Sequence, residues 1–135
     1  YLMHAPFDMK LKKLLDEDPI CKCLTDISQD HSIKTNVEYP DLRLNEVQEK
    51  EIVNLFNKSF NNAFNRIIAD HEGLKQHDNI YFCLYLIGMD EKHISAVTGK
   101  TYNTIYNRAK RILEILKSEK TVKETLRDVI IQNYL

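Results

Sequence analysis

The stretch Gly99-Lys100-Thr101 contains the residue types that close a phosphate-binding loop. In the motif G-x-x-x-x-G-K-[ST], backbone N–H groups wrap the phosphates of a nucleotide, and the hydroxyl binds Mg²⁺. The first glycine of that motif would occupy position 94, where this chain has Ile94. The residues before Gly99 also have the pattern of a short helix, whereas the motif requires a buried strand. We therefore predict no nucleotide hydrolysis at this position.

The sequence offers no clear arrangement for covalent, acid–base or metal chemistry. It contains no glycine-flanked nucleophile and no carboxylate pair in an obviously apolar setting. Two of the three cysteines form Cys21-Lys22-Cys23, which lacks the C-x-x-C spacing of a zinc site, and Cys83 lies in an apolar run typical of a core. No two histidines have the i, i+4 spacing of a helical metal site. We therefore expect no catalytic residues, no enzyme activity, no metal and no cofactor.

The same stretch, extended to Arg111, fits a helix-turn-helix. That unit needs two short helices, a turn of three or four residues that often contains glycine, and a second helix with an apolar inner face. The segments Asp90–Thr98, Gly99-Lys100 and Thr101–Leu116 have this pattern. At about 100° per residue, the second helix has Ile105, Ala109, Ile112 and Leu116 on one face, and Asn103, Asn107 and Lys110 opposite, flanked by Tyr106 and Arg111.

The outer face of this second helix has side chains suited to a nucleic-acid groove. An asparagine amide can form two hydrogen bonds to adenine in the major groove, and lysine or arginine can bind phosphates or guanine. Thr101, as the N-cap, lies beside backbone N–H groups that attract anions. We expect Asn103, Tyr106, Asn107 and Lys110 to lie near bases, and Lys100, Tyr102 and Arg111 to lie near phosphates. Together with Thr101 and Thr104, they form the predicted DNA-binding set.

The distribution of charge agrees with this interpretation. Residues 90–123 include eight basic and four acidic residues, whereas residues 1–89 include ten basic and fourteen acidic residues. A basic segment in a chain of net charge −1 is what a phosphate-facing surface would produce. Solvated charges on an ordinary amphipathic surface helix are the simpler alternative.

The elements that must position this surface are predicted to be helices throughout. Glycine and proline are scarce, with three of each, and apolar residues recur at helical spacing. We expect helices over about 7–17, at Ile20–Ile27 after Asp18-Pro19, over 77–87, and from Thr121 to the end, with a loop over 29–44. Asn45 and Gln48 resemble a capping box that begins a helix of about 27 residues, roughly 40 Å long, ending near Gly73.

The predicted fold class is therefore all-α. It consists of a helical platform with a long central helix, followed by a C-terminal helix-turn-helix bundle. On the long helix, Phe56, Phe60 and Phe64 recur at intervals of four residues, which is the spacing of a stripe facing the core.

From Leu74 to Leu116 the chain resembles the DNA-binding domain of the LuxR/GerE type, which is related in shape to region 4 of sigma factors. The ungapped match has Leu74 at the start of the pattern, Gly88 fourteen residues later, Ile94 in the first motif helix, Gly99 in the turn, Thr101 at the cap, Thr104-Ile105 at the usual Thr-Val, and Ile112 and Leu116 in the closing core. The chain departs from the family at Asp78, where glutamate is usual, and at Ser95, Thr98, Lys100 and Arg108. The resemblance implies that residues 101–116 are the recognition helix in the major groove.

The segment before residue 74 is similar to the helical part that precedes this motif in multidomain bacterial transcriptional regulators. That resemblance implies a helical platform or dimerisation segment at 1–73 and a helix-turn-helix DNA-binding domain with a C-terminal helix at 74–135. The chain begins with Tyr1, not methionine, which suggests a sensor or an anchor upstream. No run approaches the 18 or so apolar residues of a membrane helix. We expect a cytoplasmic segment without membrane contact, alone or within a larger, membrane-tethered regulator.

Two functions remain open on the sequence. The leading one is the DNA-binding output domain of a bacterial transcriptional regulator, which binds double-stranded DNA as a homodimer because one recognition helix reads only a few base pairs. The alternative is a helical interaction module that binds a protein such as RNA polymerase without DNA contact, through exposed leucine, methionine or phenylalanine. Dimer contacts could come from Val122, Leu126, Val129 and Ile130, or from Leu11, Leu14 and Leu15.

Overall fold

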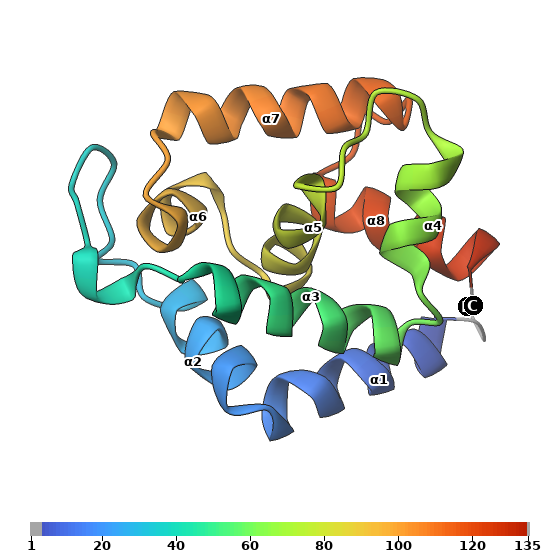
Figure 1. Ribbon diagram of the computed structural model, residues 1–135, viewed down its shortest axis with the longest axis horizontal. Coiled ribbons are helices and arrows are strands. Elements are labelled where there is room, and N and C mark those ends of the chain that lie inside the picture. The colour runs from blue at the N-terminus through green and yellow to red at the C-terminus, as the bar shows by residue number, and fades with distance from the viewer. Residues whose placement is uncertain (1–3, 135) are drawn as a thin grey trace.

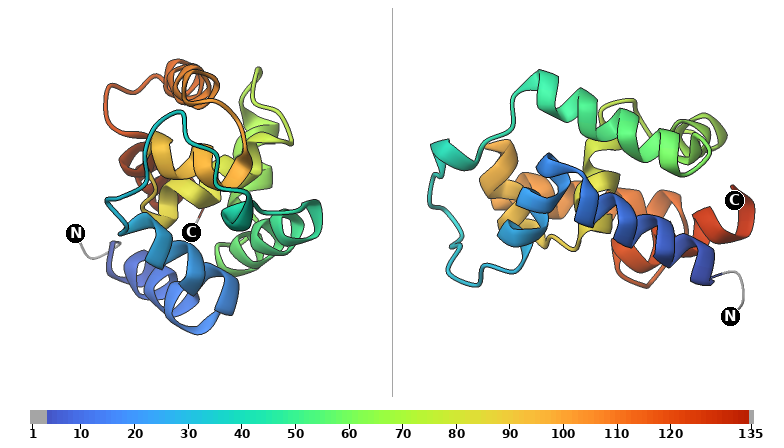
Figure 2. Two further views of the ribbon diagram at one scale, coloured as in Figure 1. Left: turned by 90° about the vertical axis from the view of Figure 1, so that its left-hand side faces the viewer. Right: turned by 90° about the horizontal axis from the view of Figure 1, so that it is seen from below.

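The computed structural model describes residues 4–134 and shows that the protein is all-α, as the sequence predicts. The helices are α1 (His4–Glu17), α2 (Pro19–Ser28), α3 (Glu46–Ser59), α4 (Ala63–Asp70), α5 (Asp78–Ile87), α6 (Glu91–Thr98), α7 (Tyr102–Ile115) and α8 (Val122–Asn133), with a 3-10 turn, η1 (Pro40–Leu42), before α3. Helix α7 lies along one side of the molecule and α1 along the opposite side (Figure 1). Two further views in Figure 2 show the segment between α2 and α3 extending beside α6.

Helix α5 is the centre of the core. Every residue from Asp78 to Ile87 is buried. The sequence of α5 is apolar or aromatic at nearly every position after the first turn, and a helix that is apolar all round must be covered all round. It packs against α2, α3, α4 and α8. Cys83 is fully buried on this helix, which confirms its prediction as a core residue. Any polar group on α5 therefore needs a partner inside the protein.

Aromatic side chains fill the space beside α5. Phe56, Phe60 and Phe64 are buried, which confirms that the predicted aromatic stripe belongs to the core. The ring centroid of Phe56 lies 6.1 Å from that of Phe60 and 5.8 Å from that of Phe64. Phe7 extends the cluster at 4.9 Å from Phe60, and Phe82 at 5.6 Å from Phe64. These spacings favour aromatic pairs, and the cluster joins α1, α3, α4 and α5.

The prediction of one long central helix ending near Gly73 is wrong. The segment forms two helices, α3 and α4, separated by residues 60–62. Asn61 and Asn62 have φ angles of 56° and 59°, in the left-handed region that asparagine adopts more readily than most residues. Two consecutive residues in this conformation break the helix, so the apolar periodicity that continues across the break belongs to two helices.

A buried amide stabilises this break between α3 and α4. Oδ1 of Asn57 accepts hydrogen bonds from the backbone N–H groups of Phe64 at 3.1 Å and Asn65 at 3.4 Å. These donors belong to the first turn of α4, where backbone N–H groups have no partner within the helix. The side chain of Asn62, the residue before α4, forms no capping hydrogen bond. Asn57, a residue of α3, therefore caps the N-terminus of α4.

Five predicted helix starts are confirmed by their caps, whereas the first helix begins at His4, before the predicted start near Phe7. A side-chain oxygen accepts a hydrogen bond from the backbone N–H three residues later at Asp18, Asn45, Asp90, Thr101 and Thr121. Asn45 and Gln48 form both hydrogen bonds of a capping box. Gly88 and Gly99 end α5 and α6 with φ angles of 111° and 73°, which a residue with a side chain rarely adopts.

The apolar face of α8 belongs to the core of the protein itself. Val122, Leu126 and Ile130 are at most 5% exposed, and α8 packs against α5. These three of the four residues predicted for a contact with a second copy are therefore covered within one chain, and the fourth, Val129, is half-buried. The second predicted contact lies on α1, where Leu11, Leu14 and Leu15 are half-buried.

The segments on either side of residue 73 share one cluster of buried side chains. Phe7 and Leu24 belong to it from the first segment, and Leu86 and Leu126 from the second. Helices α2 and α3 pack against α5, and α1 packs against α8. The division of the chain into 1–73 and 74–135 stays a prediction, and in residues 4–134 the core extends across it.

Replacing Asn57 with alanine should destabilise the protein by about 1–2 kcal/mol, because two backbone N–H groups of α4 lose their acceptor. Urea unfolding followed by far-UV circular dichroism measures this change in the free energy of unfolding. Asn54→Ala is the matched control, since Asn54 is exposed on the same helix. Equal stability of the two variants would show that the Asn57 amide does not stabilise the break.

Candidate nucleic-acid interface

Helices α6 and α7 pack against each other and are joined by residues 99–101. On the inner face of α7, Ile105 and Ile112 are fully buried and Ala109 is 8% exposed. Leu116, just after the helix, is half-buried. The inner face predicted from the helical periodicity is therefore confirmed. Because this face is held by the core, the opposite face of α7 points away from the protein.

Side chains of α6 hold the connection between the two helices. Ser95 donates a hydrogen bond from its hydroxyl to the carbonyl oxygen of Lys100 at 2.6 Å. The hydroxyl of Thr98 donates to the carbonyl oxygen of Ile94 at 2.7 Å and accepts from the backbone N–H of Lys100 at 3.3 Å. Ser95 and Thr98 are two of the positions where the chain departs from the LuxR/GerE pattern. Here both fix the backbone of the turn with hydroxyl groups.

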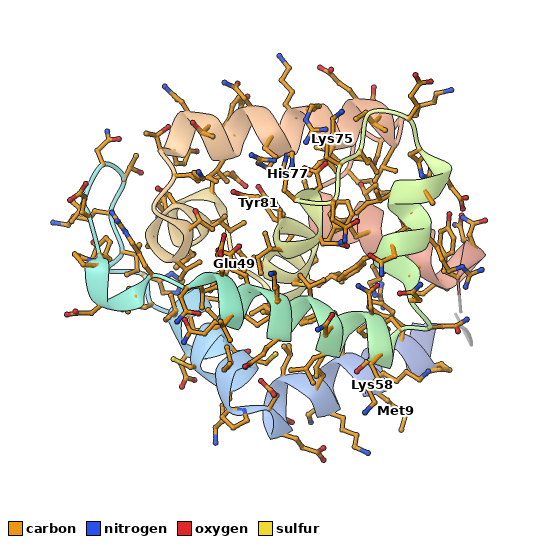
Figure 3. The ribbon with its side chains drawn as sticks, in the orientation of Figure 1. Met9, Glu49, Lys58, Lys75, His77 and Tyr81 are labelled. Atoms are coloured by element: carbon orange, nitrogen blue, oxygen red, sulfur yellow. The ribbon has the colours of Figure 1, made fainter. Side chains whose placement is uncertain are left out.

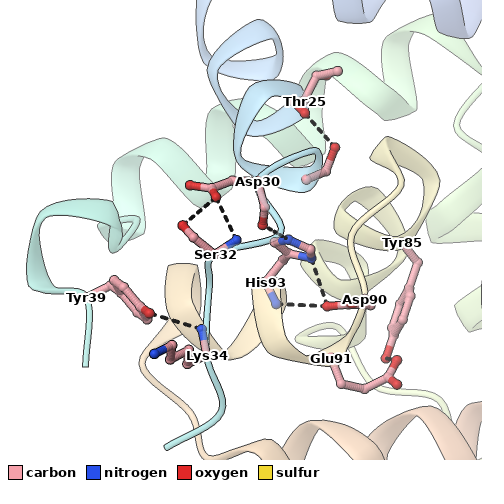
Figure 4. A network of polar contacts seen from close by, with 10 residues as sticks. Thr25, Asp30, Ser32, Lys34, Tyr39, Tyr85, Asp90, Glu91 and His93 are labelled. Atoms are coloured by element: carbon pink, nitrogen blue, oxygen red, sulfur yellow. Dashed lines mark hydrogen bonds and ion pairs between the residues drawn. The ribbon is translucent and has the colours of Figure 1, made fainter. Parts of the chain in front are cut away.

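The segment between α2 and α3 is attached to α6 through a buried histidine. Nε2 of His93 lies 2.9 Å from the carbonyl oxygen of Asp30, and Nδ1 lies 2.8 Å from Oδ1 of Asp90 (Figure 4). The same Asp90 carboxylate caps α6 by accepting from the backbone N–H of His93. The imidazole therefore joins the loop to the first turn of α6 (Figure 4).

A second attachment of this loop lies at the turn before α7. The backbone N–H of Leu44 donates to the carbonyl oxygen of Val97 at 2.8 Å. The Arg43 side chain packs on Gly99, where a Cβ atom would lie 3.0 Å from Arg43 Nε. The positive φ angle of Gly99 favours glycine at this position, and the flexible Arg43 side chain packs closely against it. The turn is held by α6 on one side and by the loop on the other.

The outer face of α7 is polar and accessible. Asn103, Thr104, Asn107 and Lys110 are exposed, and Tyr106 is 52% exposed. The ring of Tyr106 stacks on that of half-buried Tyr102, with centroids 6.5 Å apart and planes 16° apart. This stacking limits the freedom of the Tyr106 ring. Amide, aromatic and ammonium groups therefore form one continuous surface along the helix.

At the beginning of α7, two threonine side chains lie at the helix cap and the lysine before them is exposed. Oγ1 of Thr101 accepts from the backbone N–H of Thr104 at 3.2 Å and lies 2.8 Å from the Thr104 hydroxyl. Both threonine hydroxyls are therefore engaged with each other at the cap. Lys100 is exposed in the turn just before them. Of these three predicted residues, Lys100 has the side chain that extends freely into solvent.

The carboxylate of Asp78, fully buried at the start of α5, binds two arginines of α7. Its Oδ1 accepts from Nη1 of Arg108 at 3.1 Å and from Nη2 of Arg111 at 2.6 Å. Its Oδ2 accepts from the backbone N–H of Lys75 at 2.8 Å. Nη1 of Arg111 also donates to the carbonyl oxygen of Gly73 at 2.8 Å. We call Asp78, Arg108 and Arg111 the carboxylate clamp; it holds α7 to α5 and to the loop before α5.

An aromatic ring completes the environment of Arg108. Its guanidinium carbon lies 4.3 Å from the centroid of the buried Tyr81 ring, a position favourable for a cation–π interaction. Burial raises the pKa of the Tyr81 hydroxyl above its ordinary value, and the positive charge of Arg108 opposes this shift. The Arg108 side chain is only 18% exposed. It therefore faces the interior of the protein, away from the exposed face of α7.

The clamp revises the role expected for Arg111. The sequence suggested a phosphate contact, but the Arg111 guanidinium is bound to Asp78 and Gly73, and its side chain is 36% exposed. Sequence reasoning did not identify the clamp, because Asp78 and the two arginines are about 30 residues apart in the chain. The available signal was a carboxylate at the start of an otherwise apolar helix, since a buried charge needs a partner.

The structure adds two basic residues to the predicted set. Lys75 and His77 are exposed in the loop before α5 and lie between α5 and α7 (Figure 3). They border an open hollow of about 400 Å³, whose other lining residues are Gly73, Thr104, Asn107, Arg108 and Arg111. Loop residues carry no periodic signal, so the sequence could not place them beside α7. They extend the basic surface from α7 toward the loop.

Replacing Asp78 with asparagine should lower the free energy of unfolding by about 3–5 kcal/mol, because two arginines lose a buried counter-charge. Urea unfolding at neutral pH measures this loss. The matched control is Glu114→Gln, which removes an exposed carboxylate from α7 and should change stability by less than about 0.5 kcal/mol. If D78N and E114Q differed in their free energy of unfolding by less than about 0.5 kcal/mol, the clamp would not stabilise the fold.

Comparisons with family models, curated proteins and solved structures gave no match for this chain. Within residues 4–134, no helix has both the length and the apolar character needed to cross a membrane.

Proposed function

We propose that this protein binds double-stranded DNA by placing α7 in the major groove, as the DNA-binding output domain of a bacterial transcriptional regulator. The observation that carries the proposal is the exposed row of Asn103, Asn107 and Lys110 on a helix whose opposite face is buried. A helix fixed by its inner face and polar on its outer face can enter a groove without loss of its own packing. Amides and an ammonium group match the hydrogen-bonding groups of base edges and phosphates.

The composition of the exposed surface favours DNA over a protein partner. Among residues 4–134, the large hydrophobic side chains that are exposed are Met9, Val37, Val47 and Tyr106. Tyr106 alone of these belongs to α7, and its hydroxyl gives it a polar edge. A helix that bound RNA polymerase or another protein through this face should carry exposed leucine, methionine or phenylalanine. Binding to RNA polymerase without DNA remains the alternative function.

Basic residues around α7 suit the DNA backbone. Lys100 lies in the turn before α7, Lys110 lies in its third turn, and Lys75 lies beside it in the loop. Each cation placed against a phosphate releases counterions, so the affinity falls as salt rises. These positions surround the exposed amides, so phosphate contacts would fix the orientation in which the amides meet the bases.

A single α7 reads few base pairs, so the proposed active form is a homodimer. Helix α1 is the surface we propose for this contact, because the apolar face of α8 is buried in the core. Leu14 of α1 lines a groove of about 480 Å³ together with Leu55 of α3, Lys10 and Lys13. Helix α1, which lines this groove, lies on the side of the molecule opposite α7 (Figure 1), so a contact there would leave α7 free for DNA.

Fluorescence anisotropy with a duplex recovered from a random-sequence library tests DNA binding. Affinity should fall steeply between about 50 and 200 mM salt. Lys110→Ala should weaken binding to every duplex and reduce the log–log salt slope by about 1, whereas Asn107→Ala should cost about 1–3 kcal/mol on the selected duplex alone. Both residues are exposed, so neither change should unfold the protein.

Lys22→Ala is the matched control, since it removes an exposed lysine from α2, which lies away from both α7 and the proposed dimer groove (Figure 1). Its affinity and salt slope should equal those of the unaltered protein. Absence of any binding to the library at low salt would reject DNA binding. Capture of RNA polymerase that is unaffected by Asn107→Ala would then support the alternative function.

A further inference from the structure

The two arginines of α7 are not available as base-reading groups. Arginine bound in a bidentate manner to guanine is the commonest specific contact in the major groove. In this protein, Arg108 and Arg111 both donate to the buried Oδ1 of Asp78, and Arg111 also donates to Gly73. Reaching a base would break a buried ion pair and leave the Asp78 carboxylate with fewer partners, which is costly. The helix therefore carries two guanidinium groups but presents neither to a groove.

The groups that remain at the beginning of α7 are amides. Asn103 lies in the first turn and Asn107 in the second, and both are exposed. The first turns of a recognition helix are those that contact base edges. An asparagine amide donates to N7 and accepts from the N6 amino group of adenine, a pairing that no other base pair offers in the same geometry. The exposed part of the helix thus matches adenine better than guanine.

The neighbouring tyrosine fits the partner base of adenine. Tyr106 is 52% exposed and its ring is held against Tyr102. Thymine presents a methyl group in the major groove, and apolar or aromatic surface is what recognises it. Lys110 lies one turn beyond Tyr106, in the third turn of α7, whereas Asn103 and Asn107 lie in the first two turns, which contact base edges in a recognition helix. An A·T base pair therefore finds both an amide and an aromatic surface on this face.

We infer that α7 reads A·T base pairs, with Asn103 and Asn107 binding adenine and Tyr106 contacting a thymine methyl group, because the carboxylate clamp withholds both arginines from guanine. This inference rests on the proposed DNA binding and adds the base class that the helix selects. It assigns the clamp a part in specificity as well as in stability.

Base-analogue substitution in a selected duplex tests the inference. The duplex is recovered from a library with about 20 random base pairs, a length that accommodates two half-sites one helical turn apart. Replacing a contacted adenine with 7-deazaadenine removes the N7 acceptor and leaves Watson–Crick pairing intact. For the unaltered protein, affinity should fall by about 5- to 150-fold at one or more adenines of each half-site.

The Asn103→Ala and Asn107→Ala variants identify which amide is responsible. At the adenine that each amide contacts, the variant should already bind the unmodified duplex more weakly and should lose no further affinity with 7-deazaadenine. Replacement of thymine by uracil, which removes the methyl group, should weaken binding by the unaltered protein and not by Tyr106→Ala. Guanine replaced by 7-deazaguanine is the matched control and should leave affinity unchanged.

Two results separate failure of this inference from failure of the proposed function. A selected site whose affinity falls with 7-deazaguanine and not with 7-deazaadenine would overturn adenine reading while supporting DNA binding. Salt-dependent binding with no sequence enrichment would also overturn it, because binding would then involve the backbone alone. Absence of any binding to the library would overturn both.

Discussion

The buried carboxylate of Asp78 sets the position of α7 relative to the core. It accepts hydrogen bonds from Arg108 and Arg111 on one oxygen and from the backbone of Lys75 on the other. Asp78 is the first residue of α5, whose residues are all buried, so its ion pairs hold α7 against the core of the protein. A buried charge without these partners would be strongly destabilising, so the carboxylate tolerates few other arrangements.

The same arrangement divides the surface of α7 into two kinds of group. Arg108, which packs on Tyr81, and Arg111, which binds Asp78, stabilise the fold. Asn103, Asn107 and Lys110 are left for a partner. Attachment of the loop before α3, through His93 and the packing of Arg43 on Gly99, fixes the turn that precedes these groups. Stability and proposed recognition therefore depend on different side chains of one helix.

Local signals in the sequence predicted much of the fold. Caps at Asp18, Asn45, Asp90 and Thr101 each depend on a side chain and a backbone N–H three residues apart, so the sequence alone contains both partners. The inner face of α7 followed from periodicity in the same way. The long helix failed because periodicity continues through Asn61 and Asn62, whose left-handed conformation is stabilised by the more distant Asn57.

The sequence by itself determined the all-helical class, the helix starts that have a local cap, the buried face of α7 and the residue types on its outer face, because each is set by contacts within a few residues. Only the tertiary structure decided which cations are free. Arg111 and Lys110 are neighbours in the chain, yet one is bound to Asp78 and the other is exposed. It also decided that α8 closes the core and that Lys75 and His77 lie beside α7. These outcomes depend on contacts between residues far apart in the chain, so a local sequence pattern cannot predict them.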